Sequence, residues 1–313
     1  MRFGSWQRWS SQLSLALALA ALGAALALAT PNFLTVPNLV NLVRQISING
    51  ILAVGVTLVL LTGGVDLSLG SLVALSGVAA AHFAQTPGAV AWPVVAGIGA
   101  GALCGAASAA VISYGRVAPF VVTLGMMTAA RGMALVLSGG RPVSNLNPEF
   151  TRLGSGDVAG VPAPVLALAA VAVLCHVILR HLRLGRYIYA VGGNEAAART
   201  SGVDVRRVKL FAYTLCGALA GLAGVVLAAR ITTGQPNAGV GYELDAIAAA
   251  VIGGASLAGG AGGVGGTILG ALLMGVINNG LDLLNVSSYY QQIVKGVIIV
   301  GAVLLDRGKE KRA

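Results

Sequence analysis

The sequence predicts an all-α polytopic membrane protein with about ten transmembrane helices. The chain has 313 residues, of which 57% are hydrophobic and only 10% are charged, and its mean hydropathy is +0.86. Soluble domains carry roughly 25% charged residues, so a chain this apolar and this poor in charge does not fit a soluble fold. The apolar residues form runs of roughly 17–23, the length of a helix that crosses the hydrocarbon layer. Outer-membrane strands, in contrast, alternate apolar and polar residues over roughly 10 positions.

The first apolar run, from Leu13 to Ala29, is interpreted as a retained membrane span. It is longer than the roughly 7–15 residues of a signal-peptide core. Further runs of the same character follow it along the chain. The predicted spans are 13–29, 40–62, 67–85, 91–113, 119–138, 162–180, 208–230, 244–258, 264–282 and 289–305, of which 244–258 is the shortest.

The basic residues predict the orientation of these spans. Ten crossings place both termini on one side, and cytoplasmic segments of membrane proteins are enriched in Lys and Arg. With cytoplasmic termini, fourteen of the 20 Lys and Arg residues lie on that side, against four outside and two within spans. Both termini and the central polar loop (about 181–208) are therefore predicted to be cytoplasmic, and the loop at about 139–161 lies outside. Neither loop is long enough for a domain, so residues 1–313 are expected to form a single transmembrane domain.

Glycines recur every four residues in three of the predicted spans. The series are Gly97, Gly101 and Gly105, then Gly217 and Gly221, then Gly266 and Gly270. Small residues at this spacing let helix backbones approach closely in lipid, where van der Waals contact drives helix association. Close packing is the role expected for them. A shorter echo, GGVDLSLG at 63–70 and GGASLAGG at 253–260, shares four residues at matching offsets, which chance in a glycine-rich chain can explain.

Several function classes find no support in the sequence. The net charge of +10 is attributed to basic cytoplasmic loops and not to nucleic-acid binding. Residues 260–265 match GxGxxG but lack the βαβ context of a dinucleotide site, and no GxxxxGK[ST] phosphate-binding loop occurs. The three cysteines lie singly in apolar runs, and the three histidines build no metal cluster. Because no nucleophile–base pair is evident, we expect no enzyme, no bound cofactor and no metal.

Polar residues in or beside the apolar runs are candidates for a solute path. A charge near the bilayer centre costs roughly 2.5–3.5 kcal/mol on insertion scales, so charged positions there need a reason. Lys295 is set apart because its long side chain can snorkel to the interface, and no convincing pair of opposite charges is evident. Neutral polar side chains can equally line a path for an uncharged solute. The candidates are Asn49, Thr57, Thr62, Asp66, Ser68, Thr123, Arg131, Asp245, Asn278 and Asn279.

The central polar loop contains the pattern of a short separate helix. Gly192 and Gly193 are expected to break the chain, and Asn194 can cap the helix that follows. Glu195 then occupies the first turn, where the helix dipole favours a negative charge, and three alanines continue the helix. Gly202 can end it after about two turns. A stiff, alanine-faced helix suits docking into a partner's groove; the alternative is a loop that is only solvated.

At these residues the chain resembles the permease subunits of bacterial ABC importers of the ribose, xylose and galactose type. GNEAAARTSG (193–202) is similar to that family's coupling loop, although four residues, where the generic importer pattern has three, separate EAA from the glycine. The resemblance covers about 35–305 of the chain. It is carried by GGVDLSLGS (63–71), APFVVTLGMMTAARG (118–132), SGGRPV (138–143), GYELDAIAAAVIGGASLAGG (241–260) and NNGLDLLNVSSYYQQIVKG (278–296).

The resemblance implies a permease subunit of the bacterial inner membrane that imports a monosaccharide such as ribose. ATP and Mg²⁺ would bind to a partner ATPase docked on the coupling loop, in agreement with the missing phosphate-binding loop. A periplasmic sugar-binding protein would deliver the sugar, and a second permease copy in the lipid bilayer would complete the path. Closure of the ATPases would drive alternating access. The residues implied in ATPase coupling are Gly193, Asn194, Glu195, Ala196, Ala197 and Gly202.

Two other functions are compatible with the sequence. An importer permease for branched-chain amino acids or another small solute has a related pattern, but a zwitterion should meet paired charges or helix ends. The absence of an evident pair mildly favours a neutral solute. A stand-alone carrier driven by an ion gradient needs no ATPase, and the small number of buried charges argues against it. The binding protein sets most of the specificity in such importers, so this chain does not predict which sugar is carried.

Overall fold

The computed structural model describes residues 5–310, with side chains over 12–301 and at Leu304. Arg2, Lys311 and Arg312 of the predicted cytoplasmic set therefore lie outside the described residues. The chain within this range is mostly helical, with one two-stranded antiparallel hairpin. Its elements are α1 (Ser5–Ala29), α2 (Val36–Leu61), α3 (Leu69–Ala84), α4 (Ala91–Gly115), α5 (Pro119–Ser138), α6 (Pro148–Ser155), β1 (Asp157–Val158), β2 (Val161–Pro162), α7 (Ala163–His181), α8 (Arg183–Gly193), α9 (Glu195–Thr200), α10 (Val205–Ile231), α11 (Tyr242–Ile252), α12 (Val264–Leu283) and α13 (Ser288–Glu310).

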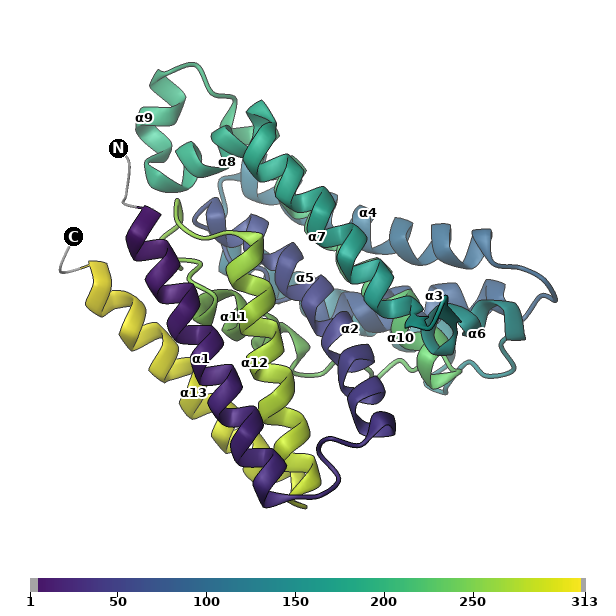
Figure 1. Ribbon diagram of the computed structural model, residues 1–313. Helices are drawn as coiled ribbons and strands as arrows, with labels where there is room; N and C mark the ends of the chain where they lie inside the picture. The colour runs from purple at the N-terminus through teal and green to yellow at the C-terminus, as the bar shows by residue number, and fades with distance from the viewer. Residues whose placement is uncertain (1–4, 311–313) are drawn as a thin grey trace.

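The centre of the molecule is formed by α2, α3 and α10, whose side chains are buried along most of their length. On one side α4 packs along α3 and α10, and on the other α11 and α12 pack along α2. The outer edge is made by α1, which packs on α12, and by α13, which packs on α11 (Figure 1). The centre is apolar, with Leu52, Leu58 and Leu60 fully buried, so the polar positions within it stand out.

Prolines and left-handed residues mark where several helices begin and end. Pro37, Pro119 and Pro148 lie in the first turns of α2, α5 and α6, where the fixed φ of proline suits the helix and no N–H is lost. Arg116 ends α4 with a φ of 55° and Gly139 ends α5 with a φ of 62°. The turn from α4 into α5 is therefore sharp, and it places Arg116 at the surface beside the start of α5.

The periodic glycines form the contact between α4 and α10, as predicted. A Cβ at Gly101 would overlap the carbonyl oxygen of Gly217, and a Cβ at Gly105 would overlap that of Tyr213. Gly270 on α12 approaches the carbonyl oxygen of Ala249 on α11 in the same way. Alanine at these positions would push the two backbones apart, so the close packing predicted from the spacing is confirmed.

Seven helices are long and apolar enough to cross a membrane: α1, α2, α4, α5, α7, α10 and α12. They coincide with seven of the ten predicted spans. The prediction of a span at 67–85 corresponds to α3, which has only 16 residues. The span predicted at 244–258 is not confirmed, because α11 has 11 residues and reaches about 17 Å at 1.5 Å per residue. The glycines that follow it, with Gly254 at a φ of +94°, favour a loop. The span predicted at 289–305 lies in α13, whose side chains are described only in part.

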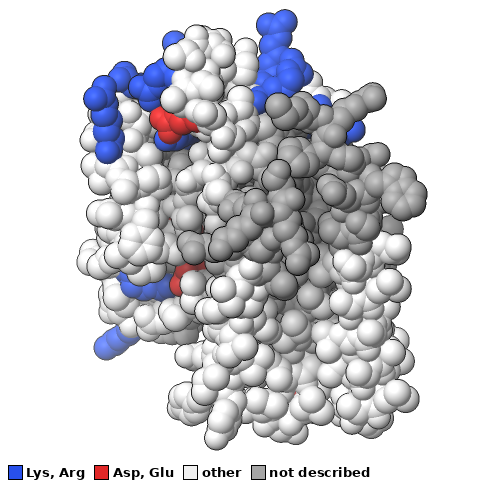
Figure 2. All heavy atoms as spheres, turned by 90° about the vertical axis from the view of Figure 1, so that its left-hand side faces the viewer, with Lys and Arg blue, Asp and Glu red and all other residues white. Residues whose placement is uncertain are grey.

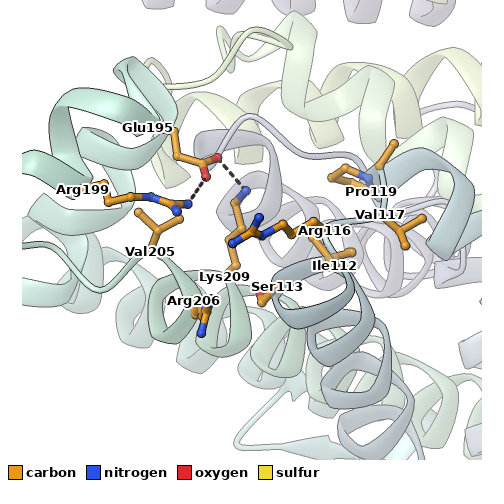
Figure 3. Close-up of a pocket in the computed structure, with 11 residues that line it drawn as sticks. Ile112, Ser113, Arg116, Val117, Pro119, Glu195, Arg199, Val205, Arg206 and Lys209 are labelled. Carbon is orange, nitrogen blue, oxygen red and sulfur yellow. Dashed lines mark hydrogen bonds and ion pairs between the residues drawn. The ribbon is translucent and has the colours of Figure 1, made fainter.

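Basic side chains occur at both ends of the described molecule. Arg116, Arg199 and Lys209 line one cavity at the end that carries α8 and α9 (Figure 3). At the opposite end, Arg44 forms an ion pair with Asp157 at 3.1 Å. Figure 2 shows Lys and Arg gathered at the α9 end, above a surface that is mostly uncharged. The start of α1 and the end of α13 lie at that same end (Figure 1).

Candidate functional site

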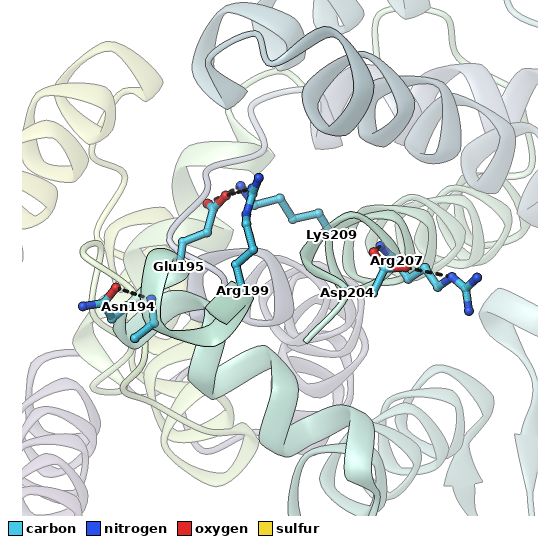
Figure 4. Close-up of polar contacts among 7 residues, drawn as sticks. Asn194, Glu195, Arg199, Asp204, Arg207 and Lys209 are labelled. Carbon is cyan, nitrogen blue, oxygen red and sulfur yellow. Dashed lines mark hydrogen bonds and ion pairs between the residues drawn. The ribbon is translucent and has the colours of Figure 1, made fainter. Parts of the chain in front are cut away.

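The short helix predicted in the central loop is present as α9. Asn194 has an extended backbone with a φ of −162°, and its side-chain oxygen accepts a hydrogen bond of 2.9 Å from the N–H of Ala197 (Figure 4). Gly202 has a φ of +83°, a left-handed conformation that glycine adopts without strain. Asn194 as the cap and Gly202 as the terminator are therefore confirmed.

The carboxylate of Glu195 forms two ion pairs within the chain (Figure 4). One oxygen lies 3.0 Å from Arg199 on the same helix, and the other lies 2.7 Å from Nζ of Lys209 on α10. The hydrogen bond from Lys209 lowers the pKa of Glu195, burial opposes it, and the Lys209 and Arg199 charges add to the lowering. Because the Lys209 side chain is only 17% exposed, this pair is less screened than a surface pair. Glu195 thus ties α9 to α10, and sequence reasoning did not identify Lys209 as its partner.

The α8 helix continues through Gly192 and Gly193, so the predicted break at this glycine pair is wrong. The chain breaks at Asn194 instead. Gly192 has a different role, because its α-carbon lies against two other segments. A Cβ there would overlap the carbonyl oxygen of Leu61 and lie 2.6 Å from the nitrogen of Gly260, whereas Gly193 has open space around it. We call the contact of Gly192, Leu61 and Gly260 the glycine junction.

The two sequence segments that echo each other meet at the glycine junction. The Leu61 carbonyl accepts a hydrogen bond of 3.1 Å from the N–H of Gly260. The hydroxyl of Tyr189 on α8 donates to the carbonyl of Gly262 at 3.0 Å. One echo segment connects α2 to α3 and the other connects α11 to α12, and both turn the chain at the α9 end. The echo segments therefore form two neighbouring turns, but the turns are not equivalent, because Gly63 has a φ of 78° and the matching Gly253 has a φ of −68°.

Two non-helical segments lead into α3 and α11. Residues 62–68 precede α3 and residues 232–241 precede α11. A Cβ at Gly70 would overlap the Gly239 carbonyl oxygen and the carboxylate of Glu243, so the starts of the two helices lie against each other. The N-termini of interrupted helices carry partial positive charge and commonly line substrate sites in transporters.

Four of the candidate path residues lie on or against the segment 62–68. Asp66 is fully buried, and its Oδ1 accepts hydrogen bonds from the N–H of Ser68 at 2.9 Å and from its hydroxyl at 2.6 Å. Its Oδ2 has no partner among the described residues. The hydroxyl of Thr123 on α5 donates to the Val65 carbonyl at 3.3 Å, and Thr62 caps the end of α2. These residues form one polar group beside the start of α3.

Arg131 holds the other non-helical segment. One nitrogen of its guanidinium donates to the carbonyl of Pro236 at 2.6 Å and to that of Ala238 at 2.8 Å. Glu243 interacts with Arg131 electrostatically. Arg131 is half-buried, and a charge satisfied by backbone carbonyls stabilises a non-helical backbone in the membrane region. Arg131 is thus placed where the two interrupted helices meet, and Glu243 is a neighbour that sequence reasoning missed.

Three other candidates lie on α2 or α12, away from this group. Thr57 is buried and lies 2.8 Å from the hydroxyl of Thr267. Asn279 and Asn38 exchange two amide hydrogen bonds of 2.8 and 3.1 Å. Asn49 is half-buried on α2. The two paired sites join α2 to α12, as interhelical hydrogen bonds do in membrane proteins, so the ten candidates do not form one cluster.

Asp245 and Lys295 form an ion pair that sequence reasoning did not find. The Nζ of Lys295 on α13 lies 2.8 Å from Oδ2 of Asp245 on α11, and Asn278 donates to the same oxygen at 3.4 Å. Oδ1 of Asp245 has no partner among the described residues. The expectation that no convincing pair of opposite charges exists is therefore wrong: the residues are 50 positions apart, and only the packing of α13 on α11 brings them together.

A polytopic helical protein with interrupted helices at its centre and a capped helix in its basic loop is built as a membrane transport subunit. Among the described residues, no three His, Cys, Asp or Glu side chains are placed to hold a metal ion. Residues 38–303 match the family described as the branched-chain amino acid transport system permease component. The chain belongs to this family and is a multi-pass membrane permease.

Relatives within this similarity are named as sugar permeases. The chain is 48% identical to the ribose import permease of Escherichia coli K12 over 96% of this chain and 95% of the relative. It is 45% identical to the ribose import permease of Bacillus subtilis over 89% and 87% of the two chains. It is 37% identical to the D-allose permease protein of Escherichia coli K12 over 96% and 92%. No solved structure matches the chain.

Proposed function

We propose that this chain is the membrane-spanning subunit of an ATP-driven importer for ribose or a closely similar monosaccharide. The observation that carries the proposal is α9, a capped helix tied to α10 through Glu195 and Lys209, in a chain 48% identical to ribose import permeases. The family description names branched-chain amino acids, but the relatives with the higher identities are named for ribose. A neutral sugar is therefore favoured over a zwitterion.

The proposed topology has both termini, α8 and α9 in the cytoplasm, and α6 with its hairpin in the periplasm. The chain then crosses the membrane ten times. The passage that the sequence assigns to 244–258 is completed by the segment 232–241 together with α11. The gathering of basic residues at the α9 end supports this orientation, as does the position of both chain ends there (Figure 1).

The sugar path is proposed to pass the point where α3 and α11 begin. Asp66, Ser68, Thr123 and Arg131 lie on or against the segments 62–68 and 232–241, and Thr62 lies at the start of the first segment. Carboxylate, hydroxyl and guanidinium groups suit the hydroxyls of a sugar, because each can exchange hydrogen bonds with them. Glu243, which lies against Gly70, joins this set.

The coupling mechanism is proposed to use two routes from α9 into the membrane region. The first is the Glu195–Lys209 pair, which transmits motion of α9 to α10. The second is the glycine junction, through which α8 contacts the turn after α2 and the turn before α12. Since the turn after α2 leads to Asp66, movement of α8 displaces the segment beside the proposed path. ATP-driven closure of the partner ATPases would thereby favour one access state over the other.

The partners follow from this mechanism. ATPase subunits, which bind ATP and Mg²⁺, dock on α9 through Gly193, Asn194, Glu195, Ala196, Ala197 and Gly202. A periplasmic sugar-binding protein docks at the α6 end. A second copy of the permease completes the path, and lipid surrounds the pair. This arrangement makes the chain a transport subunit, and hydrolysis is performed by its partner.

Reconstitution tests the proposed function directly. Proteoliposomes that contain the permease, its co-purified ATPase and the binding protein are expected to take up radiolabelled ribose when ATP is present on the ATPase side, and to exclude leucine. The permease alone, given a pH or Na⁺ gradient, is expected to give no uptake. Uptake by the permease alone would refute the ATP-driven mechanism. Uptake of leucine in place of ribose would refute the substrate class.

A further inference from the structure

A cavity of about 530 Å³ opens between the end of α4, the start of α5, and the α9–α10 region. Its lining contains four basic side chains and one carboxylate, that of Glu195. Figure 3 shows Arg116 extending from the end of α4 toward Lys209, across the space from Glu195. The basic lining residues are Arg116, Arg199, Arg206 and Lys209.

The positive charge of this cavity is only partly neutralised by the protein. Glu195 is shared by Arg199 and Lys209. Arg116 and Arg206 have no carboxylate partner among the described residues. Ala118 and Pro119, where α5 begins, also line the cavity. Pro119 has no N–H to donate, so the positive charge of the site comes from the basic side chains. The cavity is therefore suited to an anion with several oxygens.

The surface beside the cavity is apolar and exposed. Tyr114 and Val117 flank the end of α4, and Phe120 and Val121 form the first turn of α5; all four are exposed. The guanidinium of Arg206 lies over the ring of Tyr114, 5.5 Å from its centroid. An apolar face that ends in a basic pocket at the cytoplasmic level of a membrane protein matches a phospholipid with an anionic head group.

We propose that this cavity binds the head group of an anionic phospholipid, with the acyl chains along the exposed faces of α4 and α5. The phosphate is held by Arg116 and Arg206. The lipid then lies directly behind α9 and contacts the same cavity wall as the Glu195–Lys209 pair. This proposal rests on the proposed topology, which places the α9 end at the cytoplasmic surface, but its test measures lipid retention and not transport.

The test is native mass spectrometry of the full chain, purified with any bound subunits from nanodiscs of phosphatidylcholine with and without phosphatidylglycerol. Wild type is expected to retain phosphatidylglycerol in preference to phosphatidylcholine. The variant Arg116→Gln/Arg206→Gln is expected to lose this preference, by about fivefold in affinity for each arginine, as for a basic side chain near an anionic membrane surface. Arg116→Lys/Arg206→Lys keeps the charge and is expected to retain much of it.

A matched control has the same charge change outside the cavity. Arg183 and Arg186 on α8 are exposed and do not line the cavity, so Arg183→Gln/Arg186→Gln should retain phosphatidylglycerol as wild type does. Equal retention by the Arg116/Arg206 glutamine variant would overturn the proposal. Equal loss in the α8 control would overturn it too, because the effect would then be one of net charge.

Two further arms separate other sources of the anion. Inorganic phosphate is added at millimolar concentration to protein in phosphatidylcholine nanodiscs. If wild type retains phosphate, and no longer prefers phosphatidylglycerol to phosphatidylcholine once phosphate is present, the site binds a free anion. This result would overturn the lipid proposal. Loss of a co-purifying subunit from the Arg116/Arg206 glutamine variant, with lipid retention unchanged, would show that the cavity belongs to a protein interface and would also overturn the proposal.

Discussion

Replacement of Lys209 by methionine should weaken the link between ATP hydrolysis and sugar transport while leaving hydrolysis itself nearly intact. Methionine keeps most of the length of lysine and removes its charge. Glu195 then loses the partner that lies on another helix and keeps Arg199, which lies on α9 with it. The α9 helix remains capped by Asn194, so the helix that we propose as the ATPase docking site is retained.

The expected size of the effect follows from the geometry of the pair. Exposed ion pairs contribute about 0.2–1 kcal/mol, and hydrogen bonds to charged groups about 1.5–3 kcal/mol. The Glu195 side chain is 42% exposed and that of Lys209 is 17% exposed at an N–O distance of 2.7 Å, so an intermediate value of about 1.4 kcal/mol applies. If this free energy holds α9 to α10 while the ATPases close, its loss reduces the ribose transported per ATP by up to about tenfold.

The assay measures ribose uptake and phosphate release in the same proteoliposomes. Lys209→Met is expected to reduce the ratio of ribose to ATP by several-fold. Arg199→Met removes a pair within α9, which contributes about 0.3–0.5 kcal/mol, and should change the ratio by less than about threefold. A wild-type ratio in Lys209→Met would refute the link through α10. An equal loss in Arg199→Met would show that the charge of Glu195, and not its attachment to α10, is what matters.

Three further predictions test other contacts. Gly192→Ala should impair transport and lower the unfolding midpoint in detergent, because the added Cβ meets backbone atoms, whereas Gly193→Ala, with open space around it, should unfold at the wild-type midpoint. Glu195→Gln should lower the unfolding midpoint at neutral pH, because the ion pairs of Glu195 are lost. The pKa of Glu195 in the folded protein is lowered from its ordinary value of 4.5. The difference in midpoint between wild type and variant should therefore persist down to about pH 4.5 and vanish as the pH falls further. Lys295→Met should destabilise the protein by about 3 kcal/mol, because it leaves the buried carboxylate of Asp245 without its ion-pair partner. The double variant Asp245→Asn/Lys295→Met should recover part of this loss. A double variant less stable than Lys295→Met would contradict the argument.

Much of the fold could be predicted from the sequence because lipid imposes length and composition on each span. The same rule failed for α11, since the segment 244–258 is mostly apolar but has two consecutive glycines, Gly253 and Gly254, directly after Ile252. A hydropathy scale scores those glycines as small neutral residues, so they do not end a predicted span. Glycine nevertheless has a low helix propensity, so the helix ends there. Greater weight on consecutive glycines would have ended α11 at its observed position.

Local contacts of the site could be predicted, and distant ones could not. The cap at Asn194 and the terminator at Gly202 depend on neighbours within four residues, so spacing identifies them. The Glu195–Lys209 and Asp245–Lys295 pairs depend on which helices are adjacent in the fold. The positions of these residues in the sequence do not predict that adjacency. Charged residues at intermediate depth could have been paired by sign alone, with too many equally good combinations to select these two.

The glycine junction also has a consequence for the order in which the protein is made. It joins Leu61, Gly192 and Gly260 through backbone atoms, so it cannot form until the ribosome has delivered the segment before α12. Until then, α8 and α9 are present without the turn that supports them. A nascent chain therefore exposes a docking helix that is not yet supported, and we expect a stable ATPase complex to assemble only on chains whose synthesis has passed α12. The late completion of the junction would serve as a checkpoint that keeps truncated permeases out of assembled importers.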